Sequence, residues 1–486
     1  IRCFKNRTDW RLTMKVLFAS SEAYPFAMSG GLADVAGALP KALRRRLIGC
    51  RIVMPLYSSI PDELREKMNF IGSITVSVAW RRQYCGIFEA HLDGVIYYFI
   101  DNQYYFKRDG LYGHYDDAER FAFFSRAVLD IIPHIGFKPD IIHCNDWQTA
   151  LVPVYLNAMY RSDETYRDIK TVFTIHNIQY QGKYGKELNG DVIGLPPECE
   201  SLVEYDGCVN FLKGAIQCAD KVTTVSPTYA REILEPYYSH GLDRILSQFT
   251  FKLTGIVNGI DCDVYNPETD NLIYKNYSVD DIAGKAYNKK MLQKEMGLPV
   301  RPDVPVIGIV TRLVKHKGLD LVKCVFEELL KADVQFVILG SGEWEFETFF
   351  HGEAEAHRDK VGLKLGFNTQ LAHKIYAGAD MFLMPSQSEP CGLAQLVALR
   401  YGTVPIVRET GGLNDTISDS ESGEGNGFTF KNYNAHEMEN AVWRAIGGYG
   451  DKNGWDILRK RCMQCDNSWG ISANKYIKLY KEILGK

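Results

Sequence analysis

The stretch Val306-Ile-Gly-Ile-Val-Thr-Arg-Leu-Val-Lys-His-Lys-Gly318 joins a short apolar run to a turn that carries the cations Arg312 and Lys317. A β-branched run of this length that ends in a polar, glycine-containing turn is typical of a buried strand in a parallel sheet. In a doubly wound sheet, such turns lie at the carboxyl ends of the strands, where ligands bind. The stretch therefore predicts a parallel α/β sheet with two positive charges at its ligand-binding edge.

Similar apolar runs alternate with amphipathic, helix-sized segments along the whole chain. This alternation predicts parallel sheets that are covered by helices on both faces. Because 486 residues exceed what one hydrophobic core usually organises, we expect two domains. The expected strands lie at residues 15–19, 51–56, 140–143, 171–175, 221–225, 306–311, 334–339, 381–384 and 404–407.

The segment 257–270 is rich in Asn, Gly, Asp and Pro, which is typical of a linker. We therefore expect an N-terminal Rossmann-like domain over residues 14–256 and a C-terminal one over residues 271–465. An amphipathic stretch near the end predicts a helix within 466–486. Met14 is the expected start of the protein, so residues 1–13 are expected to be an N-terminal extension.

Composition and charge argue against several classes of protein. A formal net charge of −4 lacks the basic excess that nucleic-acid-binding proteins need. No apolar stretch approaches the roughly 18 residues of a membrane span. The 12 cysteines are too sparse for a disulfide framework, and several lie in strand-like runs. We therefore expect a reducing compartment, either the bacterial cytoplasm or the plastid of a plant-like source.

A second segment, Pro385-Ser-Gln-Ser-Glu-Pro-Cys-Gly-Leu393, places Glu389 ahead of a Gly-Leu turn. A carboxylate at this place can accept hydrogen bonds from sugar hydroxyls. Arg312 and Lys317 can hold a departing diphosphate. The two segments together predict a transferase that uses a nucleotide-activated sugar.

Two glycine motifs echo each other in the two halves of the chain, Ser29-Gly-Gly-Leu-Ala-Asp-Val35 and Thr410-Gly-Gly-Leu-Asn-Asp-Thr416. Each follows a strand-like run and precedes a helical one. Each can therefore present backbone N–H groups at a helix N-terminus to an anion. The alternative is that the paired glycines only make tight turns.

Four further motifs complete an ordered series from about Lys15 to near the C-terminus: His143-Cys-Asn-Asp-Trp147, Phe173-Thr-Ile-His-Asn177, Thr224-Val-Ser-Pro227 and Val257-Asn-Gly-Ile-Asp261. In this order the motifs resemble the bacterial glycogen synthases and plant starch synthases, which are retaining glycosyltransferases that use ADP-glucose. The resemblance implies a GT-B fold, in which two Rossmann-like domains face a central cleft. It also implies glucose transfer from ADP-glucose to the non-reducing end of an α-1,4-glucan such as glycogen or starch, without a metal or other cofactor.

The motifs and the resemblance together assign roles to particular residues. His176, Arg312, Lys317 and Glu389 are the expected catalytic residues, and Asp146 and Asn177 the expected acceptor-binding ones. Tyr105 is a further acceptor candidate, because the run Tyr104-Tyr105-Phe106 offers flat faces to an oligosaccharide. The donor is expected to contact Arg312, Lys317, Gly30, Gly31, Asp34, Asn258, Phe367, Cys391, Gly392, Leu393, Thr410, Gly411 and Gly412.

The residues alone leave simpler interpretations open. His176 also fits a structural histidine at a strand end. Asp146 also fits the N-cap of the following helix. Phe367 also fits a core residue.

The chain departs from the family at Met28, where relatives carry a lysine associated with donor binding. Methionine supplies no charge, so we expect weakened donor binding that Arg312 and Lys317 partly compensate. Three rival functions follow from the same residues. They are a GT-B transferase with another donor such as UDP-glucose, a catalytically silent glucan-binding homologue, and a glycoside hydrolase that pairs Glu389 with Asp146.

Overall fold

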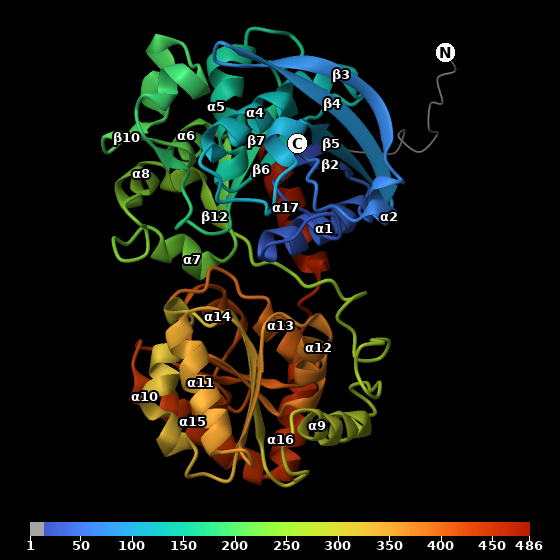
Figure 1. Ribbon diagram of the computed structural model, residues 1–486, viewed down its shortest axis with the longest axis vertical. Helices are drawn as coiled ribbons and strands as arrows, with labels where there is room; N and C mark the ends of the chain where they lie inside the picture. Colours follow the sequence, from blue (N-terminus) through green and yellow to red (C-terminus); the bar gives the residue numbers. More distant parts are fainter. Residues whose placement is uncertain (1–13) are drawn as a thin grey trace. The chain divides into compact units, whose positions relative to one another are not determined.

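The computed structural model describes residues 14–486, so the expected extension over residues 1–13 lies outside the described residues. Contacts divide the chain into two compact units (Figure 1). The first contains the chain up to Asn258 together with Trp469–Lys486, and the second contains Gly259–Ser468. None of the helices within residues 14–486 combines the length and apolar character that a bilayer crossing requires.

The first unit is built on a nine-stranded sheet. Its strands from β12 to β5 run parallel, and β4 runs antiparallel to both of its neighbours. In sheet order the strands are β12 (Leu253–Gly255), β11 (Lys221–Thr224), β7 (Lys170–Ile175), β6 (Ile141–Asn145), β1 (Lys15–Ala19), β2 (Gly49–Pro55), β5 (Val95–Asp101), β4 (Arg81–Leu92) and β3 (Asn69–Val78).

The antiparallel edge corrects the expectation of wholly parallel sheets. Strands β3 and β4 carry polar side chains along their half-exposed lengths, which is possible because an antiparallel edge can face water on one side. A small separate sheet contains β8 (Lys183–Tyr184), β10 (Cys208–Asn210) and β9 (Glu204–Tyr205).

Helices of the first unit connect the strands. The longest are α1, α4 and α17. In chain order the α-helices are α1 (Gly31–Arg44), α2 (Asp62–Arg65), α3 (Gln103–Phe106), α4 (Asp117–Asp130), α5 (Leu151–Tyr155), α6 (Phe211–Cys218), α7 (Pro227–Glu232), α8 (Asp243–Gln248) and α17 (Trp469–Ile483).

The terminal helix α17 packs in the first unit beside α1 (Figure 1). Its Tyr480 hydroxyl lies 2.6 Å from Nδ1 of the buried His143, whose Nε2 lies 2.6 Å from Thr174 Oγ1. Arg46 Nε donates a further hydrogen bond of 2.7 Å to Asn474 Oδ1. The helix is therefore fixed to β6 and β7 by a buried polar chain as well as by apolar packing.

The second unit is an all-parallel doubly wound sheet, as the apolar runs predict. Its strands in sheet order are β15 (Val361–Leu365), β14 (Gln335–Gly340), β13 (Val306–Val310), β16 (Met381–Met384), β17 (Val404–Arg408) and β18 (Phe428–Phe430). Its α-helices are α9 (Ala283–Glu295), α10 (Leu319–Leu329), α11 (Trp344–Ala356), α12 (Thr369–Gly378), α13 (Ala394–Arg400), α14 (Gly411–Thr416), α15 (Ala435–Gly450) and α16 (Lys452–Gln464).

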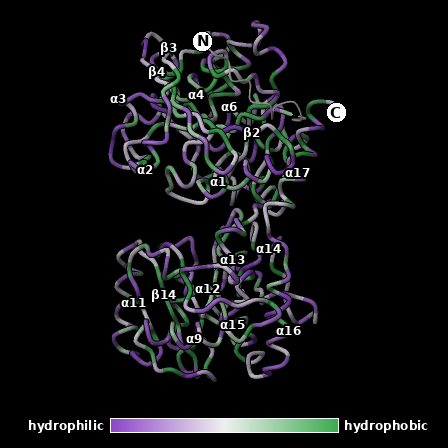
Figure 2. The backbone as a smooth tube through the Cα atoms, turned by 90° about the vertical axis from the view of Figure 1, so that its right-hand side faces the viewer, coloured by the Kyte–Doolittle hydropathy of each residue, from purple (hydrophilic) through white to green (hydrophobic). Residues whose placement is uncertain are grey.

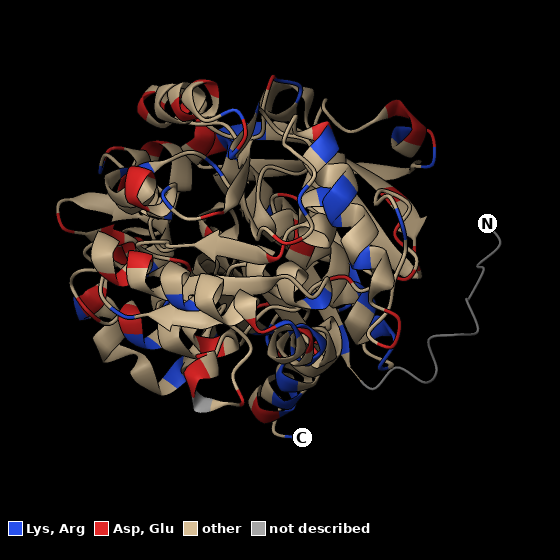
Figure 3. Cartoon of the chain, turned by 90° about the horizontal axis from the view of Figure 1, so that it is seen from below, with Lys and Arg blue, Asp and Glu red and all other residues tan. Residues whose placement is uncertain are grey.

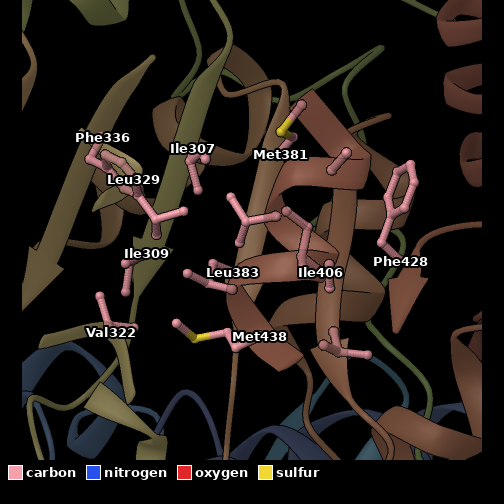
Figure 4. Packing of buried hydrophobic residues seen from close by; sticks show 14 of the residues in the cluster. Ile307, Ile309, Val322, Leu329, Phe336, Met381, Leu383, Ile406, Phe428 and Met438 are labelled. Carbon is pink, nitrogen blue, oxygen red and sulfur yellow. The ribbon is translucent and has the colours of Figure 1, made fainter. Parts of the chain in front are cut away.

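The core of the second unit lies between the sheet and its helices. Ile307 and Leu383 from the strands are buried together with Leu329 of α10 and Met438 of α15 (Figure 4). Apolar residues concentrate in strands such as β14, whereas acidic and basic residues are interspersed over the surface (Figures 2 and 3). This distribution is the one that burial of apolar surface predicts.

Part of the expected linker over 257–270 is a packed element of the second unit. Asp270 is 6% exposed. Its carboxylate accepts hydrogen bonds from His373 Nδ1 at 2.7 Å and from the Tyr401 hydroxyl at 2.5 Å. A buried carboxylate with these partners anchors the segment, so linker-like composition does not mean a free connection here.

Candidate active site

The carboxyl ends of β13 and β16 carry Lys317 and Glu389. After β13 the chain forms a 3₁₀ turn at Lys315–Lys317, and after β16 it forms the loop that contains Glu389. Lys317 Nζ donates a hydrogen bond of 2.7 Å to Glu389 Oε2, and Ser386 Oγ donates one of 2.9 Å to the same oxygen. The structure therefore brings a predicted cation and the predicted carboxylate into one ion pair at the ligand-binding edge of the sheet.

Three glycines let the backbone close around the Glu389 loop. Gly318 has φ +77°, and a Cβ there would overlap the Pro385 carbonyl. Gly411 has φ +45°, and a Cβ on Gly411 or Gly412 would overlap carbonyl groups of the Glu389 loop. The N–H of Gly412 donates to the Glu389 carbonyl at 3.1 Å. The second glycine motif is therefore needed to hold the N-terminus of α14 against the Glu389 loop.

Arg408, at the end of β17, fixes the same loop and was not among the residues predicted from the sequence. Its side chain is buried, and its guanidinium donates to the Ser386 carbonyl at 2.9 Å and to the Gln387 carbonyl at 2.5 Å. The Gln387 N–H donates in turn to the His316 carbonyl at 2.9 Å. A cation directly after the apolar run 404–407 is the sequence signal that could have indicated this role.

The other donor residues predicted in the second unit line the carboxyl edge of the same sheet. The Arg312 side chain is exposed on the turn after β13. Phe367 follows β15 and is 87% exposed, which excludes the core interpretation of this ring. The remaining ones are Cys391, which is buried, Gly392 and Leu393, which precede α13, and Thr410, the N-cap residue of α14.

Asp146 follows β6 and adopts φ +55°, which is uncommon for a residue with a side chain. Its Oδ1 accepts the backbone N–H of His176 at 2.7 Å, and no side-chain cap bond to the following helical turn is formed. Burial raises the pKa of Asp146 to about 7. Asp146 therefore holds the strand end that carries His176 and Asn177, rather than capping a helix.

His176 is neutral and has a defined tautomer. Asn145 Nδ2 donates to the Ala19 carbonyl at 3.0 Å, which turns Asn145 Oδ1 toward His176 Nε2 at 2.9 Å. Because an amide oxygen only accepts, Nε2 carries the proton and Nδ1 is an acceptor. Burial lowers the pKa of His176 to about 3. His176 is therefore suited to accept a hydrogen bond and unsuited to act as a cationic acid near neutral pH.

The first glycine motif begins α1, with Gly30 as the N-cap residue and Asp34 in the first turn. Gly30 has φ −167°, and a Cβ there would meet nothing within 4 Å. Folding therefore does not require glycine for lack of space at this position, and the free space beside Gly30 is available to a ligand. Met28, which precedes the motif, is 49% exposed.

Two further predicted residues have different outcomes. Asn258 is 6% exposed, and its Oδ1 has no hydrogen-bond partner among the described residues. Tyr105 is fully buried, and its hydroxyl contacts Glu119. The expected acceptor role of Tyr105 is therefore wrong, because its ring packs against Phe123 and offers no face to a ligand.

Comparison with known proteins decides the family. The chain is 53% identical to glycogen synthase of Geobacillus thermodenitrificans over 97% of this chain and 98% of the relative. The chain belongs to the glycogen synthase family. Glycogen synthase of Bacillus anthracis is also 53% identical, over 97% of this chain and all of the relative. Residues 15–248 match the family described as starch synthase catalytic domain, and residues 294–454 match glycosyl transferases group 1.

Solved structures support the same assignment. The catalytic domain of starch synthase IV from Arabidopsis thaliana, bound to ADP and acarbose, is 35% identical, with a TM-score of 0.91 over 97% of this chain and 100% of that chain. Sucrose-phosphate synthase from Thermosynechococcus elongatus is 17% identical with a TM-score of 0.59, covering 97% of this chain and 99% of that chain, which shows a shared fold. The predicted GT-B fold and glycosyltransferase class are confirmed.

Proposed function

We propose that the protein transfers glucose from ADP-glucose to the non-reducing end of an α-1,4-glucan, with retention of configuration. The observation that carries the proposal is the Lys317–Glu389 pair, in which Lys317 Nζ lies 2.7 Å from Glu389 Oε2 at a sheet edge closed by the glycine turns at Gly318 and Gly411. The relatives named glycogen synthase and the starch synthase with bound ADP and acarbose support the choice of donor and acceptor.

The second unit supplies the groups that hold the donor. Arg312 and Lys317 place positive charge at one sheet edge, which suits a departing diphosphate. We assign Glu389 to the hydroxyl groups of the transferred glucose and the exposed ring of Phe367 to adenine. With these groups neutralising the diphosphate, we propose that the reaction uses no metal ion and no cofactor besides ADP-glucose.

The proposed reaction is a same-face displacement. The bond between glucose C1 and the β-phosphate oxygen breaks, and a bond forms from C1 to the 4-hydroxyl oxygen of the acceptor. The hydroxyl proton passes to the departing phosphate oxygen, so that ADP and a longer glucan are the products. In the first unit, we assign neutral His176 to accept a hydrogen bond from a sugar hydroxyl at Nδ1, while Asp146 holds its strand end.

The compartment we propose is the cytoplasm. The described cysteines, from Cys50 to Cys465, are free thiols. Free thiols that lie buried in strands persist in a reducing environment.

Initial rates of ADP release with glycogen as primer, measured beside UDP release from UDP-glucose, test the proposal. ADP-glucose is expected to be the better donor. Preference for UDP-glucose would favour the other GT-B transferase function. Binding of glycogen without turnover of either donor would favour a silent homologue that lost donor charge at Met28.

A further inference from the structure

Glu22 is a buried carboxylate that the proposed reaction does not use. It lies just after β1 and is 3% exposed. Its own backbone is held in place, since Ser20 Oγ donates to the Glu22 carbonyl at 2.6 Å and the Glu22 N–H donates to Ser20 Oγ at 3.4 Å. Burial of a carboxylate costs free energy unless hydrogen bonds compensate for the lost water, so the hydrogen-bond partners of Glu22 indicate its role.

The partners of Glu22 are at the first glycine motif. The Ser29 N–H donates a hydrogen bond of 2.5 Å to Glu22 Oε2, and hydrogen bonding from the Gly30 backbone also favours the charged form. The Glu22 carboxylate therefore spans the loop between residues 22 and 29 and fixes the turn immediately before α1 by hydrogen bonding. Gly30, the N-cap residue, has no side chain that could cap α1, so the Glu22 contact with Ser29 contributes to fixing the entry into α1.

We propose that Glu22 is a positioning residue that holds the Ser29–Gly30 turn in its donor-binding conformation and holds it less tightly when protonated, because a neutral carboxyl group is a weaker hydrogen-bond acceptor than a carboxylate. The inference deepens the proposed function and rests on it, because the turn matters only if Gly30 and Gly31 contact the donor. A chain with methionine at position 28 has no cation beside this turn, so its donor contacts depend on backbone geometry.

The charges around Glu22 make protonation accessible. Asp34 on α1 and Asp146 after β6 are its carboxylate neighbours, and the neutral phenols Tyr57 and Tyr112 face it from the adjoining segments. Burial, followed by the charge of Asp34, raises the pKa of Glu22 to about 7. Glu22 therefore carries its proton below about pH 7 and loses it above. The hydrogen bond from the Ser29 N–H to Glu22 therefore strengthens as the pH rises through about 7.

The test compares wild type with Glu22→Gln, which keeps the shape but removes the charge. Hydrogen exchange at pH 8 is expected to be faster in the variant at the Ser29 and Gly30 amides. The KM for ADP-glucose is expected to rise about tenfold at pH 8 with kcat nearly unchanged, because the variant replaces a charged acceptor of the Ser29 N–H by a neutral amide oxygen, which is a weaker acceptor. At pH 6 the two proteins are expected to converge, because wild-type Glu22 is then protonated.

Asp130→Asn is the matched control. Burial also raises the pKa of Asp130, but this residue ends α4, and its carboxylate accepts a hydrogen bond from the Tyr160 hydroxyl instead of from the first glycine motif. Asp130→Asn is expected to change neither the hydrogen exchange at the Ser29 and Gly30 amides nor the KM for ADP-glucose. Equal exchange and equal KM in Glu22→Gln at pH 8 would overturn the inference, as would the same KM increase at both pH values, which would indicate a merely structural role. If wild type released no ADP, the proposed function would fail, while the exchange comparison would still decide whether Glu22 holds the turn.

Discussion

Replacing Gly30 with alanine is expected to lower the activity of the protein while changing its stability little. The space beside Gly30 is open, since a Cβ would meet nothing within 4 Å, and its φ of −167° is extended backbone that alanine adopts without strain. Alanine therefore adds neither a clash nor backbone strain to the folded chain. It removes conformational freedom from the unfolded chain, which stabilises the protein by about 0.4 to 1 kcal/mol. Because Gly30 is the N-cap residue of α1 and alanine is a poorer N-cap residue than glycine, a cost of similar size opposes this gain.

The activity is expected to fall. If donor phosphate oxygens occupy the space beside Gly30, a methyl group overpacks the site at a cost of about 1 to 3 kcal/mol. Since about 1.4 kcal/mol corresponds to a factor of ten, kcat/KM for ADP-glucose is expected to fall by about 5- to 150-fold. The melting temperature is expected to stay within about 4 °C of the wild-type value for a unit of this size.

Thermal melts and initial rates of ADP release measure the two effects on the same sample. Gly447→Ala is the control: a Cβ there also meets open space, but Gly447 lies within α15, where alanine adds about 1 kcal/mol of helix propensity. This variant is expected to gain stability with unchanged activity. Unchanged kcat/KM in Gly30→Ala would refute the assignment of the first glycine motif to donor binding.

Three further substitutions separate folding from function. Gly411→Ala is expected to lose at least about 2 kcal/mol of stability in urea unfolding, because its φ of +45° is unfavourable for alanine and the new Cβ overlaps the Glu389 carbonyl; wild-type stability would contradict the close approach. Tyr480→Phe leaves His143 Nδ1 without its partner and is expected to cost about 1 to 3 kcal/mol in the same assay; a neutral result would mean that apolar packing alone holds α17. Asp146→Asn is expected to flatten the pH dependence of stability: because the folded-state pKa is raised to about 7, the contribution of Asp146 is fully present below about pH 4 and falls as pH rises toward 7. Melting curves of the variant that keep the wild-type slope between pH 4 and 7 would show that Asp146 does not titrate there.

The sequence predicted the parallel strands well because each is a short apolar run that ends at a polar turn. The expected strand 381–384 coincides with β16, and the strand expected over 306–311 ends one residue beyond β13. The β3–β4 hairpin was not predicted. Its strands are long and partly exposed, so they lack the continuous apolar pattern that marks a central strand.

The sequence predicted the site residues that belong to a recognisable motif. It did not predict those whose role depends on how the folded chain packs. Adjacent tyrosines illustrate the limit: Asn102 caps α3 by accepting the Tyr105 N–H at 3.2 Å, which turns Tyr105 inward and leaves Tyr104 61% exposed. Nothing local in the sequence distinguishes the two rings. Glu22 was missed for the same reason, since its contact with Ser29 exists only when the chain folds back on itself.

The most direct test of the account is the rate of ADP release from ADP-glucose, with glycogen as primer, in wild type and in Glu389→Gln. The amide keeps an oxygen for the 2.7 Å contact with Lys317 but removes the charge of the pair. The account predicts turnover in wild type and a loss of about 100- to 1,000-fold in kcat for the variant, the usual cost of removing one group that stabilises a transition state. A kcat of Glu389→Gln equal to that of wild type would contradict the central role of the Lys317–Glu389 pair.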